Sequence, residues 1–141
     1  RVDRRQRQMC IRDSFMKIAN TLSLFLGVVL TIIAFQWIIN PQAAAESLNM
    51  IYLEGEGRNT QIRDFTAFFL GQAIFCFLSL STKRYHWICC AGIIFLVAAI
   101  FNIFASIYHS APITITSLVA EIIFLLIAFV SAFFYKLNEK S

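Results

Sequence analysis

The chain has 141 residues, of which 59% are hydrophobic and 14% are charged, and its mean hydropathy is +0.71. A soluble domain of this length could not cover so much apolar surface, so the composition excludes an ordinary water-soluble fold. The formal net charge is +4, but +3 of it comes from the first fourteen residues, so it does not argue for a nucleic-acid partner.

Residues 1–14, RVDRRQRQMCIRDS, have no apolar period and contain five Arg and two Asp. Met16 and Lys17 follow, and this pair is typical of the start of a membrane-inserting chain. We therefore expect residues 1–14 to be a non-native or disordered basic prefix. The alternative is a basic arm that binds nucleic acid or anionic lipid.

Four apolar runs follow, and a helix needs about 20 mostly apolar residues to cross a bilayer. The runs lack the alternation of apolar and polar residues that membrane barrel strands show. The sequence thus predicts an all-α integral membrane four-helix bundle over residues 15–135, with up-down-up-down topology. The expected spans are residues 18–39, 65–80, 87–108 and 113–134, followed by a tail at 136–141.

The first run could also be a signal peptide that is cleaved near Ala43 or Ala45. Its apolar part is longer than the 7–15 residues of a usual signal, however. Pro41 better fits the end of a retained helix, because proline cannot continue the hydrogen-bond ladder.

Basic residues at the span ends give the orientation. The link between the second and third spans carries Lys83 and Arg84 and no acid. The charged residues between the first and second spans are mostly acidic: Glu46, Glu54, Glu56, Arg58, Arg63 and Asp64. By the positive-inside rule, both termini are expected in the cytoplasm, in a multi-pass protein of the plasma membrane. The basic residues on that side are Lys17, Lys83, Arg84, Lys136 and Lys140.

Small and polar residues recur at helical spacing and predict the faces that meet in the bundle. The expected inward residues include Ser23, Gly27 and Ala34 on the first span, Gln72, Cys76 and Ser79 on the second with Ala67 and Gly71 as a small pair, and Ala128 and Ala132 on the fourth. Aromatic residues at span ends are expected to form an interfacial belt: Trp37, Tyr85, Trp87, Tyr108 and Tyr135.

Larger polar groups gather in the outer half of the predicted bundle. At 1.5 Å per residue, Glu121 lies about 12 Å below the outer end of its span, and Gln72 lies at a similar depth. Asn102 is shallower, and the cytoplasmic half holds little besides Ser, Thr, Cys and Asn20. The predicted intramembrane polar site consists of Glu121, Arg63, Gln72, Asn102, His109 and Gln36.

Glu121 is the central residue of this site. A charge at the middle of a membrane helix costs roughly 2.5–3.5 kcal/mol on insertion scales, so Glu121 should face the bundle and be protonated or meet a cation. Arg63 could reach inward from the rim, while Gln72 and Asn102 are neutral alternatives. Arg63 and Gln72 lie on opposite faces of an ideal helix, so they cannot both point at Glu121.

Motifs for catalysis or for cofactor binding are missing from the sequence. It has no Gly-rich phosphate loop, no nucleophile motif, no C-x-x-C pair and no His/Cys grouping with metal-ligand spacing. We therefore expect no enzyme activity, cofactor or metal.

Several short motifs resemble a known family. NP closes the first span, RDFTAFFLGQAIF opens the second, NIFASIYHSAP ends the third and AEIIFLL lies in the fourth. Over about residues 16–135 this order resembles the domain of unknown function 4345 family, which are DoxX-like bacterial four-helix membrane proteins. The resemblance implies the same fold and no assigned activity. Its pattern matches at Pro41, Arg63, Gly71, Pro112 and Glu121, and departs at Asn102, where the family has arginine, and at Ser110, where it has glycine.

Two functions are compatible with these features. The first is a structural or accessory membrane component whose polar cluster holds the bundle together, with the lipid bilayer and a second copy or another membrane protein as partners. The alternative is a small proton-linked transporter or permease subunit, in which Glu121 titrates in an outward-facing cavity. The expected lining of that cavity is Gln36, Gln72, Asn102 and His109. A redox-chain subunit, which only the DoxX-like resemblance suggests, is the least supported, because no span contains a pair of histidines.

Overall fold

A computed structural model of the chain describes residues 2–139. They form five helices: α1 (Val2–Ile39), α2 (Pro41–Ser47), α3 (Gly55–Thr82), α4 (Tyr85–His109) and α5 (Ile115–Glu139). Within this part of the chain, α1, α3, α4 and α5 are long and apolar enough to cross a membrane. The prediction of an all-helical chain with four apolar helices is confirmed.

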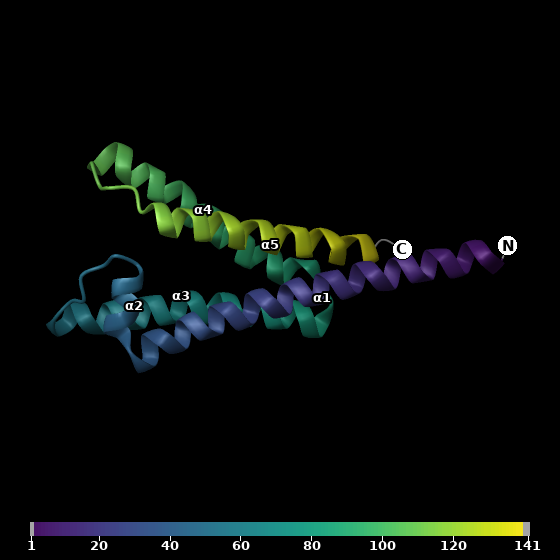
Figure 1. The fold of residues 1–141 in the computed structure, drawn as a ribbon, viewed down its shortest axis with the longest axis horizontal. Helices are drawn as coiled ribbons and strands as arrows, with labels where there is room; N and C mark the ends of the chain where they lie inside the picture. The colour runs from purple at the N-terminus through teal and green to yellow at the C-terminus, as the bar shows by residue number, and fades with distance from the viewer. Residues whose placement is uncertain (1, 140–141) are drawn as a thin grey trace.

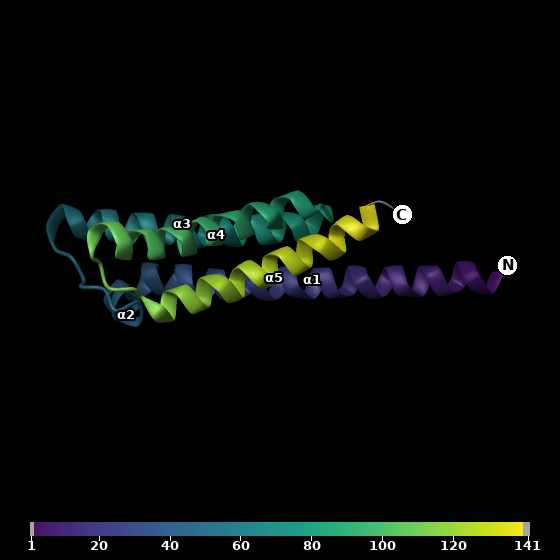
Figure 2. The same ribbon diagram turned by 90° about the horizontal axis from the view of Figure 1, so that it is seen from above.

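The four long helices form a ring in which α1 packs on α3, α3 on α4, α4 on α5 and α5 on α1. Both ends of the chain lie at the same end of the elongated molecule (Figures 1 and 2). The short link between α3 and α4 is at that end too, because Lys83 Nζ donates to Asn20 Oδ1 at 2.9 Å and Arg84 pairs with Glu139 at 3.2 Å. We call it the basic end, and the opposite one the α2 end.

Helix α1 has one continuous contact face. Its buried residues follow steps of three and four, which is the spacing that keeps side chains on one side of a helix. Several of them are small, so neighbouring helices can approach closely. The buried residues of α1 are Ala19, Ser23, Leu26, Gly27, Leu30, Ala34 and Trp37.

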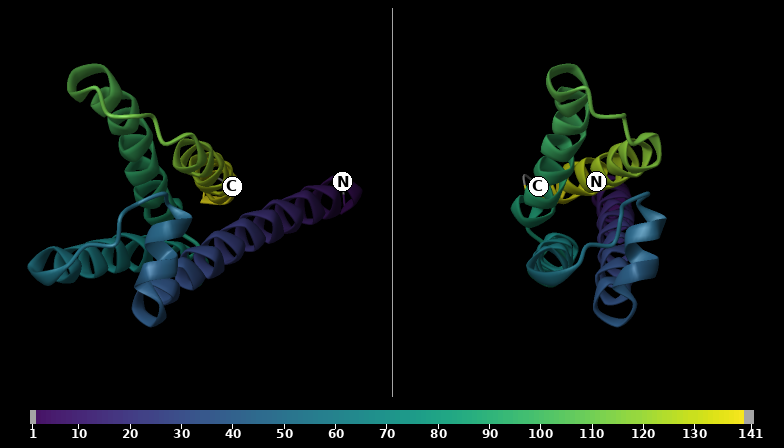
Figure 3. Two further views of the ribbon diagram at one scale, coloured as in Figure 1. Left: turned by 60° about the vertical axis from the view of Figure 1, so that its left-hand side comes forward. Right: turned by 90° about the vertical axis from the view of Figure 1, so that its left-hand side faces the viewer.

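Helices α4 and α5 are buried only near the basic end. The buried residues of α4 end at Ala99 and those of α5 begin at Ala128, so none of residues 100–127 is buried. The ribbon views show the reason, because the α4–α5 pair diverges from α1 and α3 toward the α2 end (Figures 1 and 3). The bundle is therefore closed at the basic end and splayed at the α2 end.

The closed end contains hydrogen bonds between α1 and α5. Ser131 Oγ donates to Ala19 O at 2.9 Å and lies 3.1 Å from Ser23 Oγ. Tyr135 Oη donates to Asn20 Oδ1 at 2.9 Å, so Asn20 accepts from both α5 and the α3–α4 link. These bonds join α1, α5 and the α3–α4 link. They lie in the half of the bundle for which the sequence predicted few polar residues.

The Tyr135→Phe variant tests this junction. It keeps the buried ring but leaves Asn20 with Lys83 as its donor, so we expect stability to fall by roughly 0.6–1 kcal/mol, as for other hydrogen bonds between membrane helices. Thermal unfolding of the purified protein in detergent measures the loss. Tyr108→Phe, at an exposed position near the end of α4, is the matched control and should leave the unfolding midpoint unchanged. Equal midpoints for both variants would contradict the role of the bond.

The connection between α1 and α3 is more ordered than the sequence predicted. α1 ends at Ile39, as expected, but Pro41 then begins α2, and Asn40 caps it by accepting from Ala43 N at 3.2 Å. Proline suits the first turn of a helix, where its missing N–H is not needed. α3 begins at Gly55, well before the expected start at residue 65, so much of the expected acidic loop is helical.

Other boundaries also differ from the predicted spans. Residues 2–14, expected to be a separate prefix, are continuous with α1 and extend beyond the bundle in Figure 1. α5 continues to Glu139, so most of the expected tail is the last turn of that helix. Arg1 and residues 140–141, including Lys140 of the orientation argument, lie outside the described residues.

Two groups of inward or interfacial residues were assigned wrongly. Trp37 and Tyr135 were expected at the membrane interface, but both are 0% exposed. The small pair of α3 is not a helix contact either, because Ala67 is exposed and a Cβ built on Gly71 would meet nothing within 4 Å. The residues that α3 does bury include Gln72, Cys76 and Ser79, as predicted.

Candidate functional site

A cavity of about 650 Å³ lies between the two splayed helix pairs. Its wall includes Gln36 of α1, Asn102 of α4 and Glu121 of α5, together with Leu48 and Met50 from the segment after α2. Sites for small ligands usually enclose about 300–1,000 Å³ and are mostly apolar with a few polar groups. The cavity has these properties, and it brings together three of the six predicted site residues.

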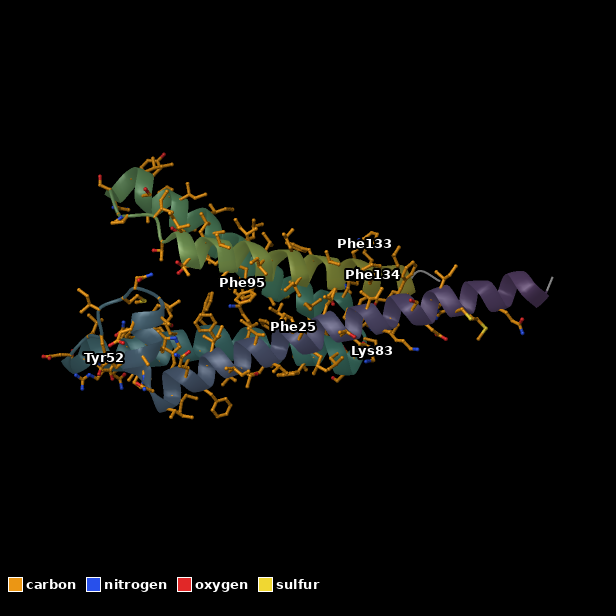
Figure 4. All side chains as sticks on the ribbon, viewed as in Figure 1. Phe25, Tyr52, Lys83, Phe95, Phe133 and Phe134 are labelled. Carbon is orange, nitrogen blue, oxygen red and sulfur yellow. The ribbon has the colours of Figure 1, made fainter. Side chains whose placement is uncertain are left out.

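Aromatic rings form much of the cavity wall. Trp37 is stacked on Phe65, with ring centroids 4.6 Å apart, so α1 and α3 are joined at the side of the cavity. Phe95 of α4 lies 6.1 Å from Phe68 and 5.2 Å from Phe124, again between ring centroids. Figure 4 shows Phe95 in the space between the two helix pairs. The rings that line the cavity are Trp37, Phe65, Phe68, Phe69, Phe95 and Phe124.

Glu121 contributes a carboxylate to this largely apolar wall. Its Oε2 atom is buried and has no hydrogen-bond partner. The side chain of Asn102 lies within hydrogen-bonding reach of the carboxyl group. The Asn102 amide also makes two hydrogen bonds with the backbone of Thr114. Its Nδ2 donates to Thr114 O at 3.3 Å, and Thr114 N donates to its Oδ1 at 3.4 Å. Asn102 thus holds the turn between α4 and α5, and Glu121 keeps an oxygen available.

Arg63 is not positioned to neutralise Glu121. Arg63 Nε donates to Asp64 Oδ1 at 2.8 Å, and these two side chains are 64% and 56% exposed. Asp64 is among the residues that line the cavity, whereas Arg63 is not. Arg63 was one of the candidate partners of Glu121 in the sequence, but the structure pairs it with its own neighbour.

Gln72 and His109 also lie apart from the cavity lining. Gln72 is buried in α3, where Nε2 donates to Phe68 O of its own helix at 3.2 Å and Oε1 has no partner. His109 is exposed in the last turn of α4, and its ring lies 6.3 Å from that of Phe104. The predicted site is therefore divided, with Gln36, Asn102 and Glu121 at the cavity and the other three outside its wall.

The ionisable residues that line the cavity are both acidic. Among the described residues that line it, Asp64 and Glu121 are acidic, and there is no Lys, Arg or His. Arg63 compensates the charge of Asp64. Glu121 is therefore the one ionisable group of the described wall without an opposite charge beside it.

One rim of the cavity is held by a residue that the sequence did not single out. Gln61 is 4% exposed; its Oε1 accepts from Leu53 N and its Nε2 donates to Ile51 O, both at 3.1 Å. Arg58 Nε donates to Leu53 O at 3.0 Å. These bonds fix the segment between α2 and α3, which supplies Leu48 and Met50 to the wall. Nothing in the sequence indicated this role, because Gln61 lies among polar residues and is not part of a repeating apolar pattern.

Within residues 2–139, no three His, Cys, Asp or Glu side chains are grouped so as to hold a metal ion. No protein-family model, curated protein or solved structure matches the chain. The four apolar helices indicate a small multi-pass membrane protein.

Proposed function

We propose that this membrane protein binds a small, mostly apolar ligand in the cavity between its helix pairs, with Glu121 as the polar anchor. The observation that carries the proposal is the buried, unpartnered Oε2 of Glu121 in the wall of an aromatic-lined cavity. An unpaired carboxylate in an apolar site is costly, so it is more often a functional group than a packing residue. Exchange of a proton for the ligand at Glu121 would make the protein a small proton-linked transporter or permease subunit.

The proposal includes an orientation in the membrane. We assign an up-down-up-down topology with both termini in the cytoplasm, in the plasma membrane, and we take the membrane to be a bacterial inner membrane. The gathering of Lys83, Arg84 and Lys136 at one end supports this orientation, since positive residues favour the cytoplasmic side. The cavity would then open toward the outside. The resemblance to the domain of unknown function 4345 family supports the same topology.

A structural or accessory component is the second candidate. It is favoured by the polar residues whose bonds stay within the chain, which are Asn102 at the α4–α5 turn, Gln72 within α3, and Ser23 with Ser131. In that case the polar groups hold the bundle together and its partner is a second copy or another membrane protein. Water would not need to reach Glu121.

Cysteine accessibility separates the two candidates. In a variant without the four native cysteines, Ser117→Cys places a thiol in the cavity wall, one turn before Glu121. A membrane-impermeant maleimide added from outside should label this variant at least tenfold faster than Val119→Cys. Val119 is the matched control because it lies at nearly the same depth of α5, is 51% exposed and is not in the cavity lining. Equally slow labelling of both variants would contradict an accessible cavity and favour the accessory role.

A further inference from the structure

We infer that the ligand of this cavity is a hydrophobic organic cation. The inference rests on the proposed function, because it names the ligand class for the same cavity. It follows from the charges, the rings and the polar groups of the wall taken together.

The first argument is the charge of the wall. Glu121 is accompanied by Asp64, whose charge is met by Arg63, and by no basic side chain among the described lining residues. A neutral ligand would leave the Glu121 carboxylate without an opposite charge, and an anionic ligand would place a second negative charge beside it. A cation supplies the missing opposite charge.

The second argument is the aromatic surface. Six rings line the cavity, from Trp37 on α1 to Phe124 on α5. The faces of aromatic rings attract cations, and this attraction is strongest where water is excluded. A cavity wall with both aromatic rings and a carboxylate therefore favours a bulky cation with apolar substituents over a small hydrated ion such as sodium. The amides of Gln36 and Asn102 add hydrogen-bonding groups without adding charge.

The third argument concerns competition with protons. A proton and an organic cation would occupy the same oxygen of Glu121, so entry of one releases the other. The titratable groups that could modify this exchange are few: α3 contributes Asp64 with its partner Arg63, and the lining residues of α1 and α4 contribute none. A cationic ligand thus gives the carboxylate a role that a neutral ligand would not.

Two ions of nearly the same shape and opposite charge test the inference: tetraphenylphosphonium and tetraphenylborate. The full chain carries Trp87→Phe, so that Trp37 in the cavity wall is its sole tryptophan. Each ion is titrated into this protein in an uncharged detergent while Trp37 fluorescence is followed. We expect saturable quenching by tetraphenylphosphonium, with an affinity at least tenfold higher than for tetraphenylborate.

Glu121→Gln in the same background should weaken tetraphenylphosphonium binding at least tenfold and remove the preference between the two ions. Glu46→Gln is the matched control. It makes the same charge change at an exposed position of α2, outside the cavity lining, and should leave the preference intact. The two ions are also compared on protein that keeps Glu121. That comparison stands even if the Glu121→Gln variant does not fold.

The outcomes separate this inference from the proposed function. Equal affinity for both ions, or a cation preference that survives Glu121→Gln, would overturn the cationic ligand and leave ligand binding in the cavity standing. The absence of saturable quenching by either ion, together with fast labelling of the Ser117→Cys variant, would also reject the cation but keep an open cavity. The absence of quenching together with slow labelling would reject both.

Discussion

Replacing Gly92 with leucine should force α4 away from α5 and sharply destabilise the protein. A Cβ atom at residue 92 would lie 3.2 Å from Ala128 Cβ and 3.4 Å from Phe129 Cζ, both on the facing helix. Ala128 is fully buried, so it cannot move aside without shifting the helix. Overpacking a tight contact costs about 1–3 kcal/mol for added methylenes, and leucine adds a whole branched side chain. Thermal unfolding in detergent gives the effect.

Gly71 supplies the control for this prediction. It is also a glycine within a long helix, but a Cβ there would meet nothing within 4 Å. Gly71→Leu should leave the unfolding midpoint unchanged or raise it slightly, because leucine favours a helix by about 0.5–1 kcal/mol relative to glycine. If Gly92→Leu and Gly71→Leu behave alike, the close approach of α4 and α5 at Gly92 is wrong.

Truncation of Trp37 to alanine should have an effect of similar or larger size. Trp37 is fully buried and stacked on Phe65, and its removal leaves a void beside the cavity. Losses of about 3–5 kcal/mol are typical when a large aromatic residue in a core becomes alanine. Chemical or thermal unfolding in detergent measures this loss against the unaltered protein.

Two further variants show which property of Trp37 matters. Phe35→Ala, two residues earlier on α1, truncates a ring that is 51% exposed, so it should cost far less. Trp37→Phe keeps an aromatic ring against Phe65 and removes an indole N–H that has no partner, so it should retain most of the stability. A Trp37→Ala variant no less stable than Phe35→Ala would refute the packing of Trp37 in the core.

The amino-acid sequence was sufficient for the four apolar helices and for much of their inward faces. Hydropathy identifies the spans, and helical spacing identified Ser23, Gln72 and Ala128 as buried residues. Counting depth along the spans was also informative, because it placed Asn102 and Glu121 in the same half of the predicted bundle. Both are found in the wall of one cavity.

Predictions from the sequence failed where the position of a side chain depended on the tilt of the helices or on an ion pair with a neighbouring residue. Hydropathy cannot distinguish a buried aromatic residue from one at the membrane interface, and Trp37 and Tyr135 were misplaced for this reason. Helical phase gives the face of a residue but not the divergence of the helix pairs. The transport hypothesis therefore placed Gln36 and Asn102 correctly in a cavity with Glu121, but it wrongly added Gln72 and His109 to the lining and missed the aromatic wall. Arg63 pairs with Asp64, the next residue in the chain, so its side chain does not extend into the bundle toward Glu121.

Two connections next to the cavity are each held by a side-chain amide. Gln61 bonds to the backbone of Ile51 and Leu53 between α2 and α3, and Asn102 bonds to the backbone of Thr114 between α4 and α5. Neither connection can move as a flap without breaking these bonds. We therefore expect the width of the cavity to change by tilting of whole helices about the basic end, where Ser131 and Tyr135 bond to α1.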